Sequence, residues 1–125
     1  MMRSVLDQAH LHPAIRQVVA DSHAAVVAEV RAAIAANPIV VIGMAQNPFV
    51  RKARKMLDAA RLPYRYLEYG SYFGGWRQRT ALKMWSGWPT FPMVFVQGVL
   101  IGGASELQRL IDDGELARMT ASPRP

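Results

Sequence analysis

The 125-residue chain contains no cysteine. Without a thiol it can form no disulfide, hold no metal through thiolates and use no cysteine as a nucleophile or redox group. Histidine is also scarce: His10, His12 and His23 all precede residue 24, and their spacing matches no common metal-ligand motif. We therefore expect no metal site, and we place these histidines on the surface of an N-terminal extension.

Long apolar runs are missing as well. No run approaches the roughly 20 residues that span a bilayer, and the opening MMRSVLDQAHLHP lacks the apolar core and cleavage pattern of a secretory signal. We therefore expect a cytoplasmic protein with no membrane partner. Hydrophobic residues make up 51% of the chain and charged residues 19%, which is typical of a folded protein, and the length fits one domain.

Acidic residues are few: the chain has 9 Asp and Glu against 15 Lys and Arg, which gives a net charge of +6. The imbalance is concentrated between Arg51 and Lys83, where the only acids are Asp58 and Glu68. Such a basic face, 51–83, is either simply solvated or attracts an acidic surface of a protein partner. Nucleic acid is not expected, because no aromatic stacking motif is interleaved with these cations. No pattern specifies an oligomeric state.

Hydrophobic periodicity divides the chain into three parts. Residues 1–21 are weakly patterned and predict an extension that is partly helical or flexible. Residues 22–119 predict a folded domain, and residues 120–125 a frayed tail. Within the domain, helices are expected at 22–36, 48–60, 76–85 and 104–113, and strands at 39–42, 64–68, 93–96 and 99–101.

Turn residues set the boundaries of these elements. Asn37-Pro38 ends the first helix, and Gln97-Gly98 joins the last two strands in a tight hairpin. The order α-β-α-β-α-β-β-α requires right-handed crossovers between the early strands, which are therefore parallel, and makes the final pair antiparallel. This predicts an α/β fold with a four-stranded mixed sheet flanked by helices on both faces.

Aromatic residues divide between core and surface. Trp85 and Phe95 are expected in the core, and Phe49 and Trp76 lie on the inward stripes of their helices. The glycine-rich loop is bracketed by residues that are expected to be partly exposed: Tyr69, Tyr72, Phe73 and Trp76.

Three motifs carry a family resemblance. They are Asn37-Pro38-Ile39-Val40-Val41-Ile42 at the first strand, Trp88-Pro89-Thr90-Phe91-Pro92 before the third, and the hairpin with Gly102-Gly103, followed by Asp113-Gly114-Glu115-Leu116. Over about residues 22–119 the chain resembles a glutaredoxin, and more closely the monothiol branch. The resemblance implies a thioredoxin-like fold.

The active-site motif of that family is not retained. Where the family has C-P-x-C or C-G-F-S, this chain has Asn47-Pro48-Phe49-Val50, so both cysteine positions are lost. A neutral carboxamide has no redox couple, and Asn47 is interpreted as the N-cap of its helix. Disulfide exchange and an iron–sulfur cluster held by this chain are not expected.

The resemblance also implies a groove for glutathione. In it, the backbone before a cis Pro92 pairs with the ligand, while Gly102 and Gly103 bring amides toward its glutamyl carboxylate. The implied ligand-binding residues are Arg79, Lys83, Thr90, Phe91, Pro92, Gly102, Gly103, Ala104 and Ser105. Each also has a purely structural explanation, as a strand entry, a turn or a solvated charge.

Two contacts of the family are missing from this groove. Its lysine after the first strand corresponds to Met44, and its aspartate after the glycine pair corresponds to Ser105, beside Glu106. Such charge-assisted contacts contribute roughly 1.5–3 kcal/mol each. Glutathione is therefore expected to bind weakly or not at all, and no other cofactor is expected.

Two functions remain open. The first is a non-catalytic binding or interaction module with a vestigial glutathione or peptide groove. The second is a transferase-like enzyme that uses glutathione without a thiol of its own, through the hydroxyl of Tyr69, Ser71 or Thr90. Deliberate removal of cysteines would normally leave Ser or Ala, so Asn47 and Val50 argue against an engineered origin of the motif.

Overall fold

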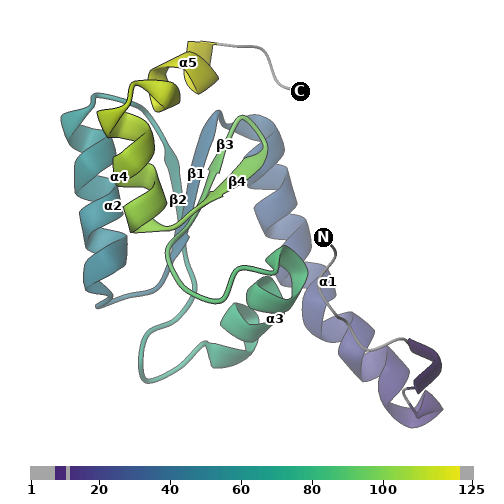
Figure 1. The fold of residues 1–125 in the computed structure, drawn as a ribbon. Helices are drawn as coiled ribbons and strands as arrows, with labels where there is room; N and C mark the ends of the chain where they lie inside the picture. Colours follow the sequence, from purple (N-terminus) through teal and green to yellow (C-terminus); the bar gives the residue numbers. More distant parts are fainter. Residues whose placement is uncertain (1–7, 11, 122–125) are drawn as a thin grey trace.

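The computed structural model describes residues 8–10 and 12–121 of the chain (Figure 1). A short 3-10 helix, η1 (Gln8–His10), precedes the long helix α1 (Pro13–Ala36). The remaining elements are β1 (Ile39–Gly43), α2 (Pro48–Ala59), β2 (Arg65–Glu68), α3 (Trp76–Ser86), β3 (Met93–Val96), β4 (Val99–Gly102), α4 (Ala104–Asp112) and α5 (Glu115–Ala121).

The four strands form one mixed sheet in the order β2-β1-β3-β4. β1 runs parallel to β2 and antiparallel to β3, and β3 runs antiparallel to β4. The hairpin between β3 and β4 turns at Gln97 and Gly98, whose φ angles are 51° and 81°. The sequence-based prediction of a four-stranded mixed sheet is confirmed, and β3 has the predicted bounds.

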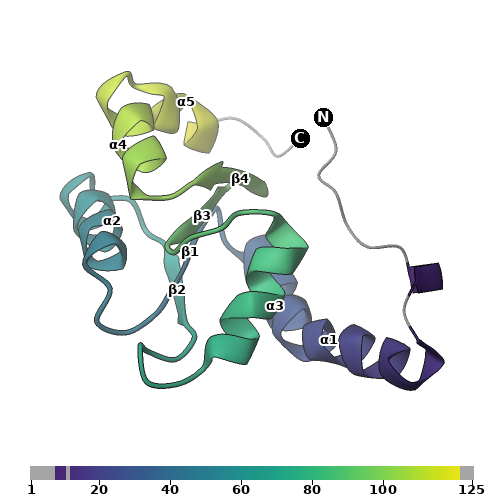
Figure 2. The same cartoon turned by 60° about the horizontal axis from the view of Figure 1, so that its bottom comes forward.

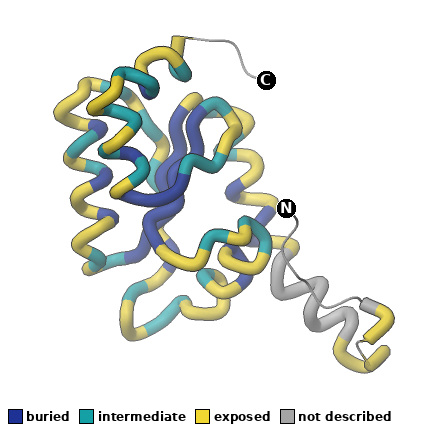
Figure 3. Tube along the Cα trace, in the orientation of Figure 1, coloured by how far each residue is buried: buried dark blue, intermediate teal, exposed yellow. Residues whose placement is uncertain are grey.

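Helices cover both faces of this sheet, as Figure 2 shows from below. On one face α1 and α3 enclose a core that includes Val30, Leu82 and Met93. On the other face α2, α4 and α5 enclose a second core around Leu57, Leu107 and further buried residues of β1 and β3. Every residue of β1 and β3 is buried because each strand lies between two helical layers (Figure 3).

The first helix is longer than predicted. It begins at Pro13 rather than at residue 22, with His12 as its N-cap: the His12 Nδ1 accepts the N–H of Ala14 at 3.0 Å. Its first turns project beyond the body of the molecule in Figure 1. The predicted boundary between residues 21 and 22 therefore falls inside a continuous helix. His10 and His12 are exposed, and the side chain of His23 lies outside the described part of the chain.

A fifth helix follows Gly114, where the sequence predicted the end of regular structure. Gly114 has a φ of 78° and turns the chain, and the Asp113 carboxylate accepts the N–H of Glu115 at 2.9 Å to start α5. Leu116 is 1% exposed in the second core, which fixes this helix to the domain. Residues 120 and 121 thus belong to α5, and residues 122–125 of the predicted frayed tail lie outside the described part.

The aromatic residues are placed partly as predicted. Trp85 and Phe95 stack in the first core with ring centres 5.9 Å apart, and Tyr72 and Phe73 are exposed. The inward placement of Phe49 and Trp76 from helix periodicity was wrong, because both side chains are 61% exposed, whereas the exposure of Trp76 expected from its place beside the loop is confirmed. The expected partial exposure of Tyr69 was also wrong: it is buried beneath α1, where its hydroxyl donates to Glu29.

Candidate functional site

Asn47 lies at the start of α2, directly after the β1–α2 turn. Its Oδ1 accepts the N–H of Phe49 at 2.8 Å and the N–H of Val50 at 3.1 Å, so it is the N-cap of the helix, as predicted. These are the orphan donors that stabilise a negative charge at a helix N-terminus. Here a neutral carboxamide of the chain itself satisfies them. Pro48 occupies the first helical position, where its fixed φ suits the helix.

The strand entry at Pro92 and the turn at Gly103 meet at one place. The Phe91–Pro92 peptide bond is cis, the isomer that the glutaredoxin resemblance implies. A Cβ added to Gly103 would lie 3.2 Å from the Pro92 carbonyl oxygen and 3.7 Å from the Trp88 Nε1. A side chain here would be in tight contact with the Pro92 backbone, so glycine eases the close passage of the two segments. The fold therefore brings the W-P-T-F-P and G-G motifs together.

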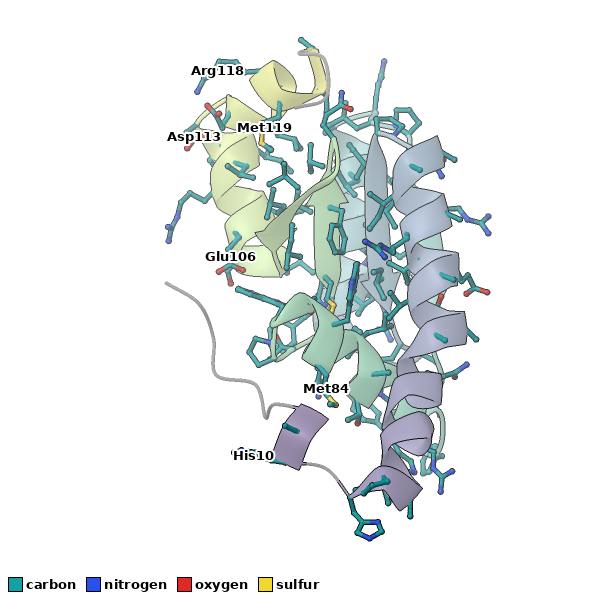
Figure 4. The ribbon with its side chains drawn as sticks, turned by 90° about the vertical axis from the view of Figure 1, so that its right-hand side faces the viewer. His10, Met84, Glu106, Asp113, Arg118 and Met119 are labelled. Atoms are coloured by element: carbon teal, nitrogen blue, oxygen red, sulfur yellow. The ribbon has the colours of Figure 1, made fainter. Side chains whose placement is uncertain are left out.

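Glu106 lies in the first turn of α4 and bonds the start of its own helix; Figure 4 labels its side chain. The Glu106 carboxylate accepts the N–H of Gly103 at 2.8 Å. A Cβ at Gly102 would lie 2.7 Å from the Glu106 side chain, so glycine allows this close approach. The resemblance assigned these amides to a ligand carboxylate. In the structure a carboxylate of the chain already occupies one of them, which repels a second anion.

Arg79 and Lys83 of α3 do not act as a pair. The Lys83 Nζ lies 5.7 Å from the centre of the Phe91 ring, so it flanks the cis bond. Arg79 instead donates from Nη1 to the carbonyl oxygens of Tyr69 at 3.0 Å and Gly74 at 2.7 Å. Sequence analysis missed this role of Arg79, because nothing in the local pattern links it to a loop five to ten residues earlier.

The other proposed ligand-binding residues surround the same place. Thr90 and Ser105 are exposed, whereas Phe91, Pro92 and Ala104 are buried. Met44, at the position of the family's lysine, is 7% exposed and carries no charge toward the site. The structure thus brings Lys83, the cis bond and the start of α4 to one end of the sheet, with Asn47 on the adjoining turn.

The hydroxyls of the alternative enzyme hypothesis are engaged elsewhere. Burial and the hydrogen bond to Glu29 raise the pKa of Tyr69, which opposes formation of a tyrosinate. The Ser71 Oγ accepts the N–H of Phe73 at 3.1 Å and stabilises a turn. Of these three residues, Thr90 is the one that is exposed and lies near the start of β3.

A pocket of about 280 Å³ opens beside Asn47, between α2 and β2. The Arg54 guanidinium lies 3.9 Å from the centre of the Tyr66 ring, and the Tyr66 hydroxyl donates to Glu68 at 3.0 Å. Burial, followed by the hydrogen bond to Glu68, raises the pKa of Tyr66 to about 12. Sequence analysis did not identify this pocket, because its lining comes from three elements.

Comparison with known proteins decides the family. A glutaredoxin-like protein of Dictyostelium discoideum is 47% identical over 94 residues, which cover 75% of this chain and 76% of the relative. The chain belongs to the glutaredoxin family. Glutaredoxin-C6 of Oryza sativa subsp. japonica is 28% identical over 89 residues, 71% of this chain and 80% of the relative. No family model matches the chain.

Solved glutaredoxins share the architecture. The crystal structure of a buckwheat glutaredoxin–glutathione complex superposes with a TM-score of 0.72 at 25% identity, covering 81% of this chain and 92% of the other. The holo form of poplar glutaredoxin C1 gives a TM-score of 0.69 at 21% identity, covering 81% and 91%. The predicted thioredoxin-like fold is therefore confirmed. This glutaredoxin-like chain differs from the family's redox motif in having no cysteine.

The described part of the chain holds neither a candidate membrane span nor a candidate metal site. No helix in residues 8–10 and 12–121 has the length and apolar character needed to cross a bilayer. In the same part of the chain no three histidine, aspartate or glutamate side chains are grouped so that they could hold a metal ion.

Proposed function

We propose that this glutaredoxin-like protein is a non-catalytic binding module whose groove takes the backbone of glutathione or a similar short peptide. The observation that carries the proposal is the combination at one end of the sheet. The thiol position is filled by the self-bonded Asn47, while the cis Phe91–Pro92 bond and its neighbour Gly103 retain the shape of a strand-addition site. The backbone shape of the groove is thus kept, although the thiol that performs the redox chemistry is absent.

Charges in the groove predict weak binding. Lys83 lies beside Phe91 and suits a ligand carboxylate, but the Glu106 carboxylate at the Gly103 amide repels a second one. Met44 and Ser105 supply neither of the charged contacts that the resemblance implies. We therefore expect glutathione to bind with a dissociation constant in the millimolar range, which corresponds to about −4 kcal/mol.

An NMR titration of the 15N-labelled protein with glutathione tests the proposal. The amide signals of Phe91, Gly103 and Ala104 are expected to shift together with one dissociation constant. Lys83→Ala should weaken binding. Lys55→Ala is the control, because it removes another exposed cation, on α2 eight residues beyond Asn47. Shifts confined to other residues, or equal effects of the two variants, would show that the groove is not the site.

Glu106→Gln gives a second test, which separates repulsion of the ligand by Glu106 from a role of this residue only in capping α4. Glutamine keeps the hydrogen-bonding geometry of the cap but removes its charge. We expect several-fold tighter glutathione binding with an unchanged melting temperature. A glutathione-dependent disulfide reductase assay completes the set: turnover above background by the purified wild-type protein would refute the non-catalytic assignment.

A further inference from the structure

The loop between β2 and α3 presents aromatic side chains to solvent on a closely bonded backbone. This aromatic loop, residues 69–76, includes Tyr72, Phe73 and Trp76, which are 61%, 90% and 61% exposed. Figure 1 shows the loop at the lower end of the molecule, away from the β3–β4 turn. Exposed clusters of large apolar side chains mark interaction sites more often than isolated ones do.

Hydrogen bonds hold the tip of the aromatic loop in one shape. The Ser71 N–H donates to the Gly74 carbonyl at 2.9 Å, and the Phe73 N–H donates to the Ser71 Oγ at 3.1 Å. Arg79 bonds the carbonyl of Gly74 from α3. Phe73 is therefore presented outward by a turn that these hydrogen bonds hold in place.

The neck of the loop requires two glycines. Gly70 and Gly75 have φ angles of 70° and 80°, and a Cβ on either would lie 2.6 Å from the Cα of the other. The Ala45 N–H donates to the Gly70 carbonyl at 2.9 Å, which ties the neck to the β1–α2 turn. A loop held this way loses little conformational entropy when a partner binds.

The stretch that follows the aromatic loop carries only cations, although Glu68 precedes the loop and Glu29 of α1 accepts the Tyr69 hydroxyl. The sequence has no acidic residue between Glu68 and Glu106, whereas Arg77, Arg79 and Lys83 lie in this stretch. The exposed Arg77 places its guanidinium 5.4 Å from the centre of the Trp76 ring. Interfaces concentrate their binding energy in Trp, Tyr and Arg, which are the residue types gathered here.

We propose that the aromatic loop and the first turn of α3 form a docking site for an acidic peptide segment of a partner protein that also carries an apolar side chain. Its apolar residue contacts Tyr72, Phe73 and Trp76, and its carboxylate faces Arg77. The three aromatic side chains offer roughly 400 Å² of exposed surface, taking 150–250 Å² for each when fully buried. That area suits a short segment in a transient complex.

Other occupants fit these observations less well. A second copy of the chain would bring together two surfaces of the same charge on molecules that each carry +6. Nucleic acid affinity at moderate salt comes from many phosphate contacts, roughly 6–10 in well-studied proteins, and this stretch offers three cations. The site does not use the groove at Pro92, so its test is independent of the glutathione titration.

A selection from a library of displayed random peptides against the immobilised protein tests the site. Peptides enriched over a parallel selection against Phe73→Ser are expected to be net acidic with a Leu or aromatic residue. A synthetic copy of the winning peptide should bind the wild type about tenfold more tightly than Phe73→Ser or Arg77→Gln. Val99→Ser is the control: it removes another exposed apolar side chain, 42% exposed, at the start of β4, and should bind like the wild type.

Phe73 is 90% exposed, so its replacement should leave the melting temperature unchanged, and Tyr72→Ser serves if it does not. Three outcomes would overturn the proposal. They are enrichment of neutral or basic peptides, equal binding of the winning peptide by wild type and variants, and no enrichment over the variant. The proposal would also be overturned if a single-stranded oligonucleotide or phosphatidylserine vesicles bound more tightly than the selected peptide and this binding were lost in Phe73→Ser. The partner would then be nucleic acid or an anionic membrane.

Discussion

Replacing Asn47 with cysteine tests whether this position corresponds to the active-site cysteine of the family, where the helix N-terminus stabilises a thiolate. The Asn47 Oδ1 already accepts two backbone N–H groups at 2.8 and 3.1 Å, and a thiolate at the same place would face the same donors. The helix dipole and the following Arg51 and Lys52 add positive potential. Thiols in such surroundings have pKa values of about 3.5–7.5, compared with about 8.5 for a free cysteine.

The expected shift is therefore at least one pKa unit, and each unit corresponds to about 1.4 kcal/mol. Because the pKa of the thiol is lowered in the folded state, the variant gains stability as pH rises above the folded pKa, up to about 8.5. It loses that stability as pH falls through the folded pKa. At low pH the neutral thiol caps poorly, and the variant should be about 1 kcal/mol less stable than the wild type.

The assay is the rate of alkylation by iodoacetamide as a function of pH. It reports one site, because the chain has no other cysteine. Ala60→Cys is the matched control: it places an exposed thiol at the C-cap of the same helix, where the dipole opposes a thiolate. Its pKa should be at or above about 8.5. Full turnover is not expected in Asn47→Cys, because Met44 and Ser105 still lack the charges that the resemblance implies.

A pKa for Cys at position 47 that equals or exceeds that of the Ala60→Cys control would refute the reasoning. The alignment of Asn47-Pro48-Phe49-Val50 with the family's redox motif would then have no physical support.

Three further predictions concern stability. Leu82→Ala empties a fully buried position in the first core and should lower the free energy of unfolding by about 2–5 kcal/mol in urea denaturation; a change below about 1 kcal/mol would contradict the packing. Gly75→Ala should destabilise the protein and perturb the amide signals of the aromatic loop, because the added methyl would meet Gly70, whereas Gly74→Ala, with open space around it, should do neither. Tyr66 has a raised pKa, so stability should be lost as pH rises from about 10 through about 12, and Tyr66→Phe should flatten that loss in urea titrations; identical profiles would exclude the contribution of Tyr66.

The strands could be predicted from the sequence because their signals are local. Ile39 to Ile42 is a continuous β-branched run between a proline and a glycine, and Met93 to Val96 is bounded by Pro92 and a two-residue turn. The interpretation of Asn47 as an N-cap succeeded for the same reason, since a cap is decided within four residues. Elements of this kind need no information from elsewhere in the chain.

Helix ends and aromatic burial depended on packing that the sequence does not display. Gly114 ends α4, but Asp113 restarts the chain as α5 and Leu116 finds a place in the second core. Tyr69 and Trp76 flank the same loop, yet only Tyr69 turns inward, because Glu29 on α1 accepts its hydroxyl. A residue forty positions away in the sequence decided that placement.

The proximity of the family motifs was predicted, whereas the contacts of the charged residues around them were not. The family motifs placed Phe91, Pro92 and Gly103 together. The use of Arg79 by the aromatic loop and of Glu106 by the Gly103 amide follows only from the three-dimensional arrangement. In the sequence alone, the positions of Arg79 and Glu106 are typical of solvent-exposed charges on a helix.

Because the N-cap at Asn47 is a carboxamide, oxidants do not change the start of α2. A cysteine at this position changes its charge, its hydrogen bonding and its covalent partners with the redox potential of the surroundings. A carboxamide keeps the same two hydrogen bonds to Phe49 and Val50 in peroxide, in excess thiol and across the physiological pH range. Under the proposed function, ligand binding in the neighbouring groove is thereby uncoupled from the oxidation state of the surroundings.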